Sequence, residues 1–220
     1  MLSRLNDIIA KYDLLNHRFY KAWSAGQLSI STLRHYAAEY YAQVSSFPRF
    51  ISKVHSNCPE IEARKVLLRN LVDEEIHGQD HPSLWTQFAQ GLGVSEAELK
   101  AENKLPATLA MVDTYYDLAD SHWTDGLCAL YAYEAQVPAV SVSKIEGLRT
   151  FYGIDDAETL AFFHAHQVYD VEHAREVGRL IDSYADSERA VLATEKAAQA
   201  LWQFLDGVSD HAGLQACDHI

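Results

Sequence analysis

Apolar residues recur along this chain at intervals of three and four positions, which is the spacing of an amphipathic α-helix. The first such stripe consists of Leu2, Leu5, Ile8, Ile9 and Tyr12. The same spacing predicts further helices over residues 17–23, from Ser29 or Ser31 toward Pro48, from Pro59 through Val72, around residues 85–92, and over residues 107–121, 125–136, 140–151, 156–184 and 187–208. No strand pattern is present, so we expect an all-α protein.

Prolines, glycines and capping residues mark where these helices should begin and end. Pro48 is expected to kink or end its helix, because proline lacks a backbone N–H. Gly78 and Pro82 interrupt the chain between two helices, and Ser95 followed by Glu98 is the pattern of a capping box. The last segment is polar. We therefore expect one helical domain over residues 1–208 and a flexible C-terminal tail over residues 209–220.

Length and composition fit one sizeable hydrophobic core. The chain has 220 residues, of which 48% are hydrophobic, with only 10 glycines and 5 prolines. This composition excludes a disordered chain and a turn-rich β-sandwich. The formal net charge of -13 argues against binding of nucleic acid or of an anionic membrane surface, since both attract basic proteins.

Cysteine usage and the N-terminal segment indicate the compartment. Cys58, Cys128 and Cys217 are widely spaced, odd in number and form no CxxC motif, so we predict reduced thiols and a cytoplasmic location. The N-terminal sequence MLSRLNDIIAKYD has an early acidic residue and no apolar signal core. No apolar run in the sequence is long enough to span a bilayer.

The strongest chemical signal is the segment HQVYDVEH at residues 166–173. On a helix, His166, Asp170 and His173 share one face, because they are spaced by four and three positions. Imidazole together with carboxylate suits iron, manganese or zinc. The alternative is a solvated polar face. Apolar neighbours such as Val168 and Val171 favour a helix inside the protein, where a buried polar face needs partners.

A second candidate lies in LVDEEIHGQDH at residues 71–81. Glu74 and His77 have the Glu-x-x-His spacing of di-iron helix bundles. Glu74 and His81 are seven positions apart and would also share a face if the helix continues past Gly78. Spacing alone does not choose between the two histidines, and an ordinary acidic helix end is the alternative interpretation.

Glu134 is the third candidate, because it follows the apolar run 127–130 in a helix expected to lie in the core. Acidic residues are rarely buried without a partner. With Glu74 and Asp170 it provides three carboxylates, and three histidines complete six ligands for two transition-metal ions. Two divalent cations against three carboxylates leave about one positive charge, which a buried centre tolerates. Open coordination positions would admit molecular oxygen.

The remaining reactive side chains have simpler interpretations. Cys128 lies six positions before Glu134 and could be a nucleophile, although a small buried hydrophobic residue is the commoner role of a free cysteine. His211, Cys217 and His219 near the C-terminus could hold a stray metal ion, but a disordered end is the simpler reading of this tail.

Taken together, these segments resemble the family of the chlamydial protein associating with death domains. That family lies in the heme-oxygenase-like superfamily, with the pyrroloquinoline-quinone-C-like and thiaminase-II-like proteins. The resemblance extends from about Leu5 to Gly207, and its segments are HRFYKAWSAGQLS, FPRFISKVHSNC, EARKVLLRNLVDEE, ALYAYEAQVP and HQVYDVEHARE. It implies a single heme-oxygenase-like helix bundle. It also implies metal ligands at Glu74, His81, Glu134, His166, Asp170 and His173, which selects His81 over His77.

The resemblance further implies a reaction. Members of this family are linked to oxygen-dependent formation of para-aminobenzoate for folate, in which a tyrosine of the protein itself supplies the aromatic ring. The matching tyrosine is Tyr20, and the lysine that supplies the amine matches Lys144. A second family tyrosine, expected near the metal centre, matches Tyr133. A third such position holds Phe162, which departs from the family pattern.

The expected cofactors are two transition-metal ions, with iron or a mixed iron and manganese pair suiting these ligands. Molecular oxygen and an external reductant would complete the reaction, and the family implies a homodimer. Three other functions stay open: a metal-free oxidase of the pyrroloquinoline-quinone-C type, a thiaminase-like hydrolase that uses Cys128, and a non-enzymatic helical interaction module. The acid-rich ligand set argues against the first, and no death-domain-binding surface is evident in the sequence.

Overall fold

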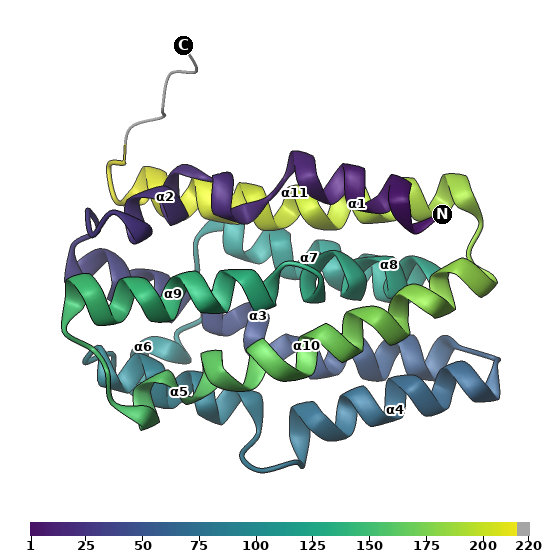
Figure 1. Cartoon of the computed structure of the whole chain (residues 1–220), viewed down its shortest axis with the longest axis horizontal. Coiled ribbons are helices and arrows are strands. Elements are labelled where there is room, and N and C mark those ends of the chain that lie inside the picture. Colours follow the sequence, from purple (N-terminus) through teal and green to yellow (C-terminus); the bar gives the residue numbers. More distant parts are fainter. Residues whose placement is uncertain (215–220) are drawn as a thin grey trace.

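The computed structural model describes residues 1–214, which contain helices and no β-strand, so the all-α prediction is confirmed. Most of the long helices run along the long axis of the molecule (Figure 1). The helices are α1 (Leu2–Lys11), the 3₁₀ turn η1 (Leu14–Asn16), α2 (Arg18–Ser24), α3 (Ile30–Asn57), α4 (Ile61–Glu75), α5 (His81–Gly91), α6 (Glu96–Leu99), α7 (Pro106–Ser121), α8 (Trp123–Glu134), α9 (Val137–Tyr152), α10 (Ala157–Tyr184) and α11 (Ser187–His211).

Helix α8 is the centre of the bundle. It packs against α11, α10, α7 and α3, and all 12 of its residues are buried. A helix that is enclosed on every side shows no polar face, which explains the continuous apolar run in its sequence. Figure 1 shows α11 and α1 along one side of the molecule and α4 and α5 along the opposite side.

Local signals in the sequence set several helix ends. Ser29 caps α3, and Asp156 caps α10, each through a side-chain oxygen that accepts a backbone N–H. Ser95 and Glu98 form the predicted capping box at α6. These contacts satisfy N–H groups that have no partner inside the helix.

Pro48 does not end its helix, so that part of the sequence prediction is wrong. Helix α3 continues to Asn57 with Pro48 inside it. A proline in a helix interior costs about 3 kcal/mol. Its neighbours Phe47, Phe50 and Ile51 are buried in the core, and their packing offsets the missing hydrogen bond.

The predicted division at residue 208 falls inside α11, which ends at His211. Ser209 is fully buried, and the ring of His211 stacks on His35 with centroids 4.0 Å apart, so packing extends the helix beyond the boundary. Residues 215–220, including the predicted tail residues Cys217 and His219, lie outside the described part of the chain. Among residues 1–214, no helix combines the length and hydropathy of a membrane span.

Candidate metal centre

Helix α10 turns polar residues toward the interior and apolar residues toward solvent between His166 and His173. His166, Asp170 and His173 are exposed by only 2%, 1% and 5%, whereas Val168 and Val171 are exposed by 69% and 58%. The sequence pattern predicts both valines inside the protein, and this prediction is wrong. Burying imidazole and carboxylate while exposing valine is unfavourable unless the buried groups gain partners. The inversion therefore indicates a ligand on this face.

Glu74 and His81 belong to different helices. Helix α4 ends at Glu75, Gly78 adopts a φ of 73° in the turn, and α5 begins at His81. The helix does not continue past Gly78, so the spacing argument for a shared face fails. The turn nevertheless brings Oε2 of Glu74 to 2.8 Å from Nδ1 of His81. This nitrogen has no hydrogen-bond partner, so the two atoms converge as ligands of a common cation would.

His77 lies outside the group of buried ligands. Its side chain is 61% exposed, and its Nδ1 lies 2.6 Å from Oδ1 of Asp73. The buried cluster on this side of the site contains His81 and not His77. The geometry thus favours the same histidine that the family resemblance selects.

Glu134 is the last residue of α8 and is completely buried. Its Oε1 accepts a hydrogen bond of 2.6 Å from Nδ2 of Asn70 on α4. The same oxygen lies 3.9 Å from Nδ1 of His173, and Oδ1 of Asp170 lies 3.8 Å from that nitrogen. One carboxylate from α8 and two side chains from α10 therefore surround one point.

The six predicted ligands form two neighbouring groups. The ligand atoms of the first group lie within 4.8 Å of one another; its members are Glu74, His81 and His166. The second group consists of Glu134, Asp170 and His173. The charge of Glu74 raises the pKa of both Glu134 and Asp170, so the two groups are close enough to interact.

Without a bound metal ion, burial disfavours the charged forms of the carboxylates and imidazoles at this site. Burial, and then the nearby Glu134 and Glu74, raise the pKa of Asp170 well above its ordinary value. Burial raises the pKa of Glu134 to about 8 and lowers the pKa of His166 well below its ordinary value. A bound metal ion would reverse the cost for the carboxylates, since it favours deprotonated carboxyl groups and neutral imidazoles.

The donor atoms fit a two-metal centre. Within residues 1–214, Oε2 of Glu134, Oδ2 of Asp170 and Nδ1 of His173 are buried without a hydrogen-bond partner. Nδ1 of His166 donates to the carbonyl oxygen of Phe162 at 2.7 Å, which leaves its Nε2 free. Buried polar atoms are normally paired, and this mixture of carboxylate and imidazole suits iron and manganese.

The two histidines near Glu74 can be separated by experiment. We expect His81→Ala to reduce the metal content by about one ion per chain, since His81 completes the first group of ligands. His77→Ala should leave the metal content unchanged. Elemental analysis of both variants, purified under identical iron-replete conditions, measures the difference. A larger loss in His77→Ala would show that the match to His81 is wrong.

Tyr20 of α2 and Lys144 of α9 lie together in the core. They are exposed by 2% and 3%. Nζ of Lys144 donates a hydrogen bond of 2.7 Å to the hydroxyl of Tyr36, and this hydroxyl lies 3.1 Å from the hydroxyl of Tyr20. The amine that the resemblance selected is therefore separated from Tyr20 by one hydroxyl group.

Lys144 sits in an aromatic environment. Its Nζ lies between 5.0 and 5.5 Å from the ring centroids of Tyr20, Tyr36, Tyr40, Trp85 and Phe163. Burial lowers the pKa of Lys144 to about 7. Near neutral pH much of this amine is consequently neutral, and a neutral lysine amine is a nucleophile.

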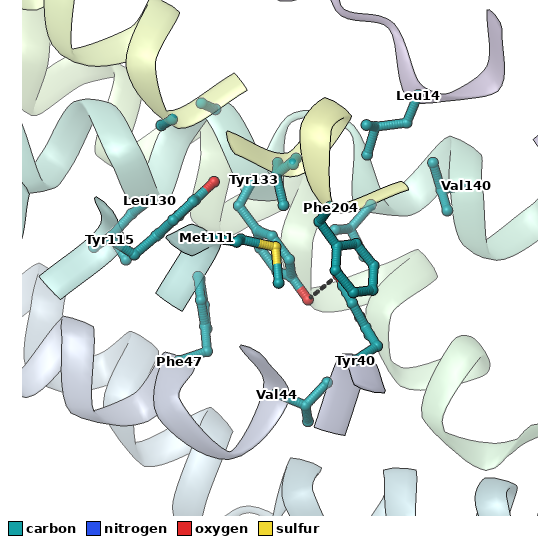
Figure 2. Packing of buried hydrophobic residues seen from close by; sticks show 14 of the residues in the cluster. Leu14, Tyr40, Val44, Phe47, Met111, Tyr115, Leu130, Tyr133, Val140 and Phe204 are labelled. Atoms are coloured by element: carbon teal, nitrogen blue, oxygen red, sulfur yellow. Dashed lines mark hydrogen bonds between the residues drawn. The ribbon is translucent and has the colours of Figure 1, made fainter. Parts of the chain in front are cut away.

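Tyrosines connect this cluster with Glu134. The hydroxyl of Tyr40 donates to the hydroxyl of Tyr133 at 3.1 Å, as Figure 2 shows. The ring of Tyr40 stacks on that of Tyr36, with centroids 5.5 Å apart. Tyr133 directly precedes Glu134 in α8. Contacts therefore run without a break from Tyr20 to a residue beside a predicted metal ligand.

Phe162 lies where the family pattern has a further tyrosine. Its ring centroid is 3.9 Å from that of His166 and 4.8 Å from that of Trp85. It has no hydroxyl and contributes packing between the metal ligands and the aromatic cluster. The contacts from Tyr20 to Tyr133 do not pass through it.

Four residues that complete this region escaped the sequence analysis: Tyr36, Tyr40, Asn70 and Asp73. Tyr36 and Tyr40 have the ordinary spacing of a core stripe, so nothing in the sequence separates them from packing residues. Asn70 and Asp73 precede Glu74 by four and one positions. Asn70 shares a helix face with Glu74, and a buried amide beside an expected ligand was a signal that the sequence contained.

Comparison with known proteins agrees with the chemistry of this site. A family model described as iron-containing redox enzyme matches residues 34–206. A 4-aminobenzoate synthase of Chlamydia muridarum is 40% identical to this chain, over 98% of this chain and 93% of that protein. Another 4-aminobenzoate synthase, from Nitrosomonas europaea, is 38% identical over 95% of this chain and 91% of that protein.

A solved structure supports the fold independently. A domain from Shewanella denitrificans with a heme-oxygenase-like fold matches with a TM-score of 0.83 over 97% of this chain and 94% of that domain, at 17% identity. At this identity the similarity shows the fold alone. Since the family model covers most of the helical bundle, including all six predicted ligands, this chain belongs to the family of iron-containing redox enzymes with the heme-oxygenase-like fold.

Proposed function

We propose that this protein is an oxygen-dependent di-metal oxidase that forms para-aminobenzoate from one of its own tyrosines. The observation that carries the proposal is the buried contact of Tyr20 and Lys144 through the hydroxyl of Tyr36. Para-aminobenzoate is a benzene ring that carries an amino group and a carboxylate. The ring and Cβ of Tyr20 and the amine of Lys144, which could supply its carbon atoms and its nitrogen, are enclosed in the same core. The relatives at 38% and 40% identity, named 4-aminobenzoate synthase, support the same product.

The two groups of ligands around Glu134 and His166 would hold the metal ions, with iron or an iron and manganese pair as the expected content. When bound, these ions would supply the activation of molecular oxygen, with electrons from an external reductant. The protein's own contribution is to keep the six ligands buried and preorganised, and to keep water away from the neighbouring tyrosines.

The chain's aromatic residues position the reacting groups. The hydroxyl of Tyr36 fixes Lys144 and Tyr20 relative to each other before any reaction, which supplies much of the rate advantage of an intramolecular process. The lowered pKa of Lys144 provides a neutral amine. In this proposal the ring and Cβ of Tyr20 become the ring and the carboxyl carbon of the product, so the Cα–Cβ bond breaks and molecular oxygen oxidises Cβ to the carboxylate. Nζ of Lys144 leaves Cε and replaces the phenolic hydroxyl, whose oxygen leaves as water with electrons from the external reductant.

An internal substrate fits the packing of this region better than an external one. Tyr20, Tyr36 and Lys144 are nearly inaccessible to solvent, and the hydroxyl of Tyr36 contacts both of the other side chains. An aromatic acid from solution would have to displace these side chains to reach the amine. A built-in tyrosine needs no such displacement.

The alternative functions fit the structure less well. A thiaminase-like hydrolase needs a reactive cysteine, whereas Cys128 is buried and burial raises its pKa to about 12, so its thiol stays protonated. A metal-free oxidase has no use for the buried carboxylates of Glu134 and Asp170. A helical interaction module would bind its partner through surface residues, and this function does not account for the buried cluster around Lys144.

Location and assembly belong to the same proposal. We place the protein in the cytoplasm, supported by Cys58 and Cys128, which are unpaired. We further propose a homodimer, which the family resemblance implies. The net charge of -13 supports the absence of nucleic-acid and anionic-membrane partners.

The proposal predicts product formation without any added aromatic compound. Iron-loaded protein given reductant and oxygen should release para-aminobenzoate up to one molecule per chain, since the ring is lost from the protein. No product should form under nitrogen. Chromatography with mass spectrometry measures the yield. Many molecules per chain from an added aromatic acid would instead show a conventional oxygenase.

A further inference from the structure

Asp73 of α4 lies directly behind the buried ligand group on α10. Its Oδ2 is 2.9 Å from Nε2 of His173, and its Oδ1 is 2.6 Å from Nδ1 of His77. A carboxylate only accepts hydrogen bonds when it is ionised, so the proton of this contact belongs to Nε2 of His173. Both oxygens of Asp73 are occupied, and neither faces the ligand group as a free donor atom.

The other nitrogen of His173 faces the carboxylates. Nδ1 lies 3.8 Å from Oδ1 of Asp170 and 3.9 Å from Oε1 of Glu134, and it is buried without a hydrogen-bond partner. A neutral imidazole that carries its proton on Nε2 presents a lone pair at Nδ1. His173 therefore offers Nδ1, and not Nε2, to the centre.

His166 has the opposite arrangement on the same helix face. Its Nδ1 donates to the carbonyl oxygen of Phe162 at 2.7 Å, so its free lone pair is on Nε2. A backbone carbonyl within α10 orients His166, whereas His173 takes its orientation from a side chain of another helix. The tautomer of His173 thus depends on Asp73.

We propose that Asp73 is a positioning residue that fixes the tautomer and ring orientation of His173, so that His173 binds metal through Nδ1 while His166 binds through Nε2. The inference rests on the proposed di-metal centre. Outer partners of this kind orient ligating histidines and raise their basicity, and their loss typically lowers metal affinity by roughly 10- to 100-fold. Asp73 and Glu74, adjacent in sequence, consequently have different roles at the same centre.

A second contact between α4 and α10 provides a control for the possibility that Asp73 has a purely structural role. Arg69 of α4 and Glu176 of α10 form a second link between the same two helices, with Nη2 of Arg69 3.0 Å from Oε1 of Glu176. Glu176→Ala removes this link without touching a ligand. If Asp73 only ties α4 to α10, Asp73→Ala and Glu176→Ala should behave alike.

Metal titration tests the inference first. Asp73→Ala should bind one of its two metal ions roughly 10- to 100-fold more weakly than wild type, whereas Glu176→Ala should match wild type. Asp73→Asn should recover part of the affinity, because its amide oxygen still accepts from Nε2. Equal affinities in wild type and Asp73→Ala would overturn the inference and leave the proposed function intact.

The tautomer can also be observed directly. Spectra correlating ¹H with ¹⁵N in histidine-labelled protein show which ring nitrogen carries the proton, in metal-free protein and with zinc as a diamagnetic stand-in. A His173→Gln sample assigns the signals. We expect the proton on Nε2 of His173 in wild type and a loss of this preference in Asp73→Ala. A proton on Nδ1 in wild type would refute the inference. Because the metal-free sample is informative, this test decides whether Asp73 fixes the tautomer of His173 separately from whether wild type binds metal.

Discussion

Replacing both His166 and Asp170 by alanine will remove at least one of the two transition-metal ions that the wild-type chain is expected to bind. His166 and Asp170 are nearly inaccessible to solvent, and they belong to different ligand groups of the centre. Elemental analysis after purification under iron-replete conditions gives the ions per chain. If wild type holds no more metal than the double variant, the centre does not exist.

The matched control for this variant lies on the opposite face of the same segment. Val168→Ala with Val171→Ala also changes two residues of α10, but both valines are largely exposed. Surface substitutions of this kind usually change the free energy of unfolding by less than about 0.5 kcal/mol. The control should therefore keep the metal content of wild type, and it shows whether any loss reflects the ligands or a general weakening of α10.

The pH dependence of metal binding provides a second readout of the same prediction. In the metal-free protein, burial holds the pKa of Glu134 at about 8, and the pKa of Asp170 is also raised. The folded state therefore keeps protons that the unfolded chain releases, and metal binding must displace them. The rise in melting temperature on adding metal should grow between about pH 5 and pH 8. The double variant should show a smaller rise at every pH.

The limits of sequence reasoning are clearest at Glu74 and His81. Their seven-residue spacing suggested a shared helix face, yet the helix ends at Glu75 and the turn at Gly78 brings the two side chains together. The pattern identified candidate residue types, but the contact depends on tertiary structure. Helical period was informative for fold class because it repeats in every segment. The local effect of proline was a weaker guide: α3 continues past Pro48, where core packing outweighs that effect.

The exposed valines of α10 show why the ligand face was hard to predict. Val168 and Val171 suggested that the whole segment is buried, whereas burial is confined to the polar face. A site that places polar residues inside and apolar residues outside reverses the usual periodicity, and such conflicts are expected at functional sites. Lys144 gave no signal at all in the sequence pattern, since its role depends on four helices that meet around its amine.

The ring and the amine of para-aminobenzoate will both come from the protein itself. The contact from Lys144 through Tyr36 to Tyr20 supports the proposal that Tyr20 is the source of the ring, which is the tyrosine that the family resemblance also selects. Ring-labelled tyrosine incorporated during expression should therefore be found in the product. Tyr20→Phe should abolish product formation. Tyr131→Phe is the matched control, because Tyr131 is also a buried tyrosine but its hydroxyl bonds Asn6 instead.

The reaction rate should depend on pH through Lys144, because its amine must be neutral to react. Burial holds its pKa at about 7, so the rate of product formation should rise as the pH increases through about 7. Lys144→Arg keeps a positive charge at every such pH and should strongly reduce product, whereas Lys104→Arg, at a lysine outside this cluster, should not. Mass spectrometry of the spent protein should find the changes at residues 20 and 144. Unlabelled product, or spent protein with an intact Tyr20, would show that the ring comes from elsewhere.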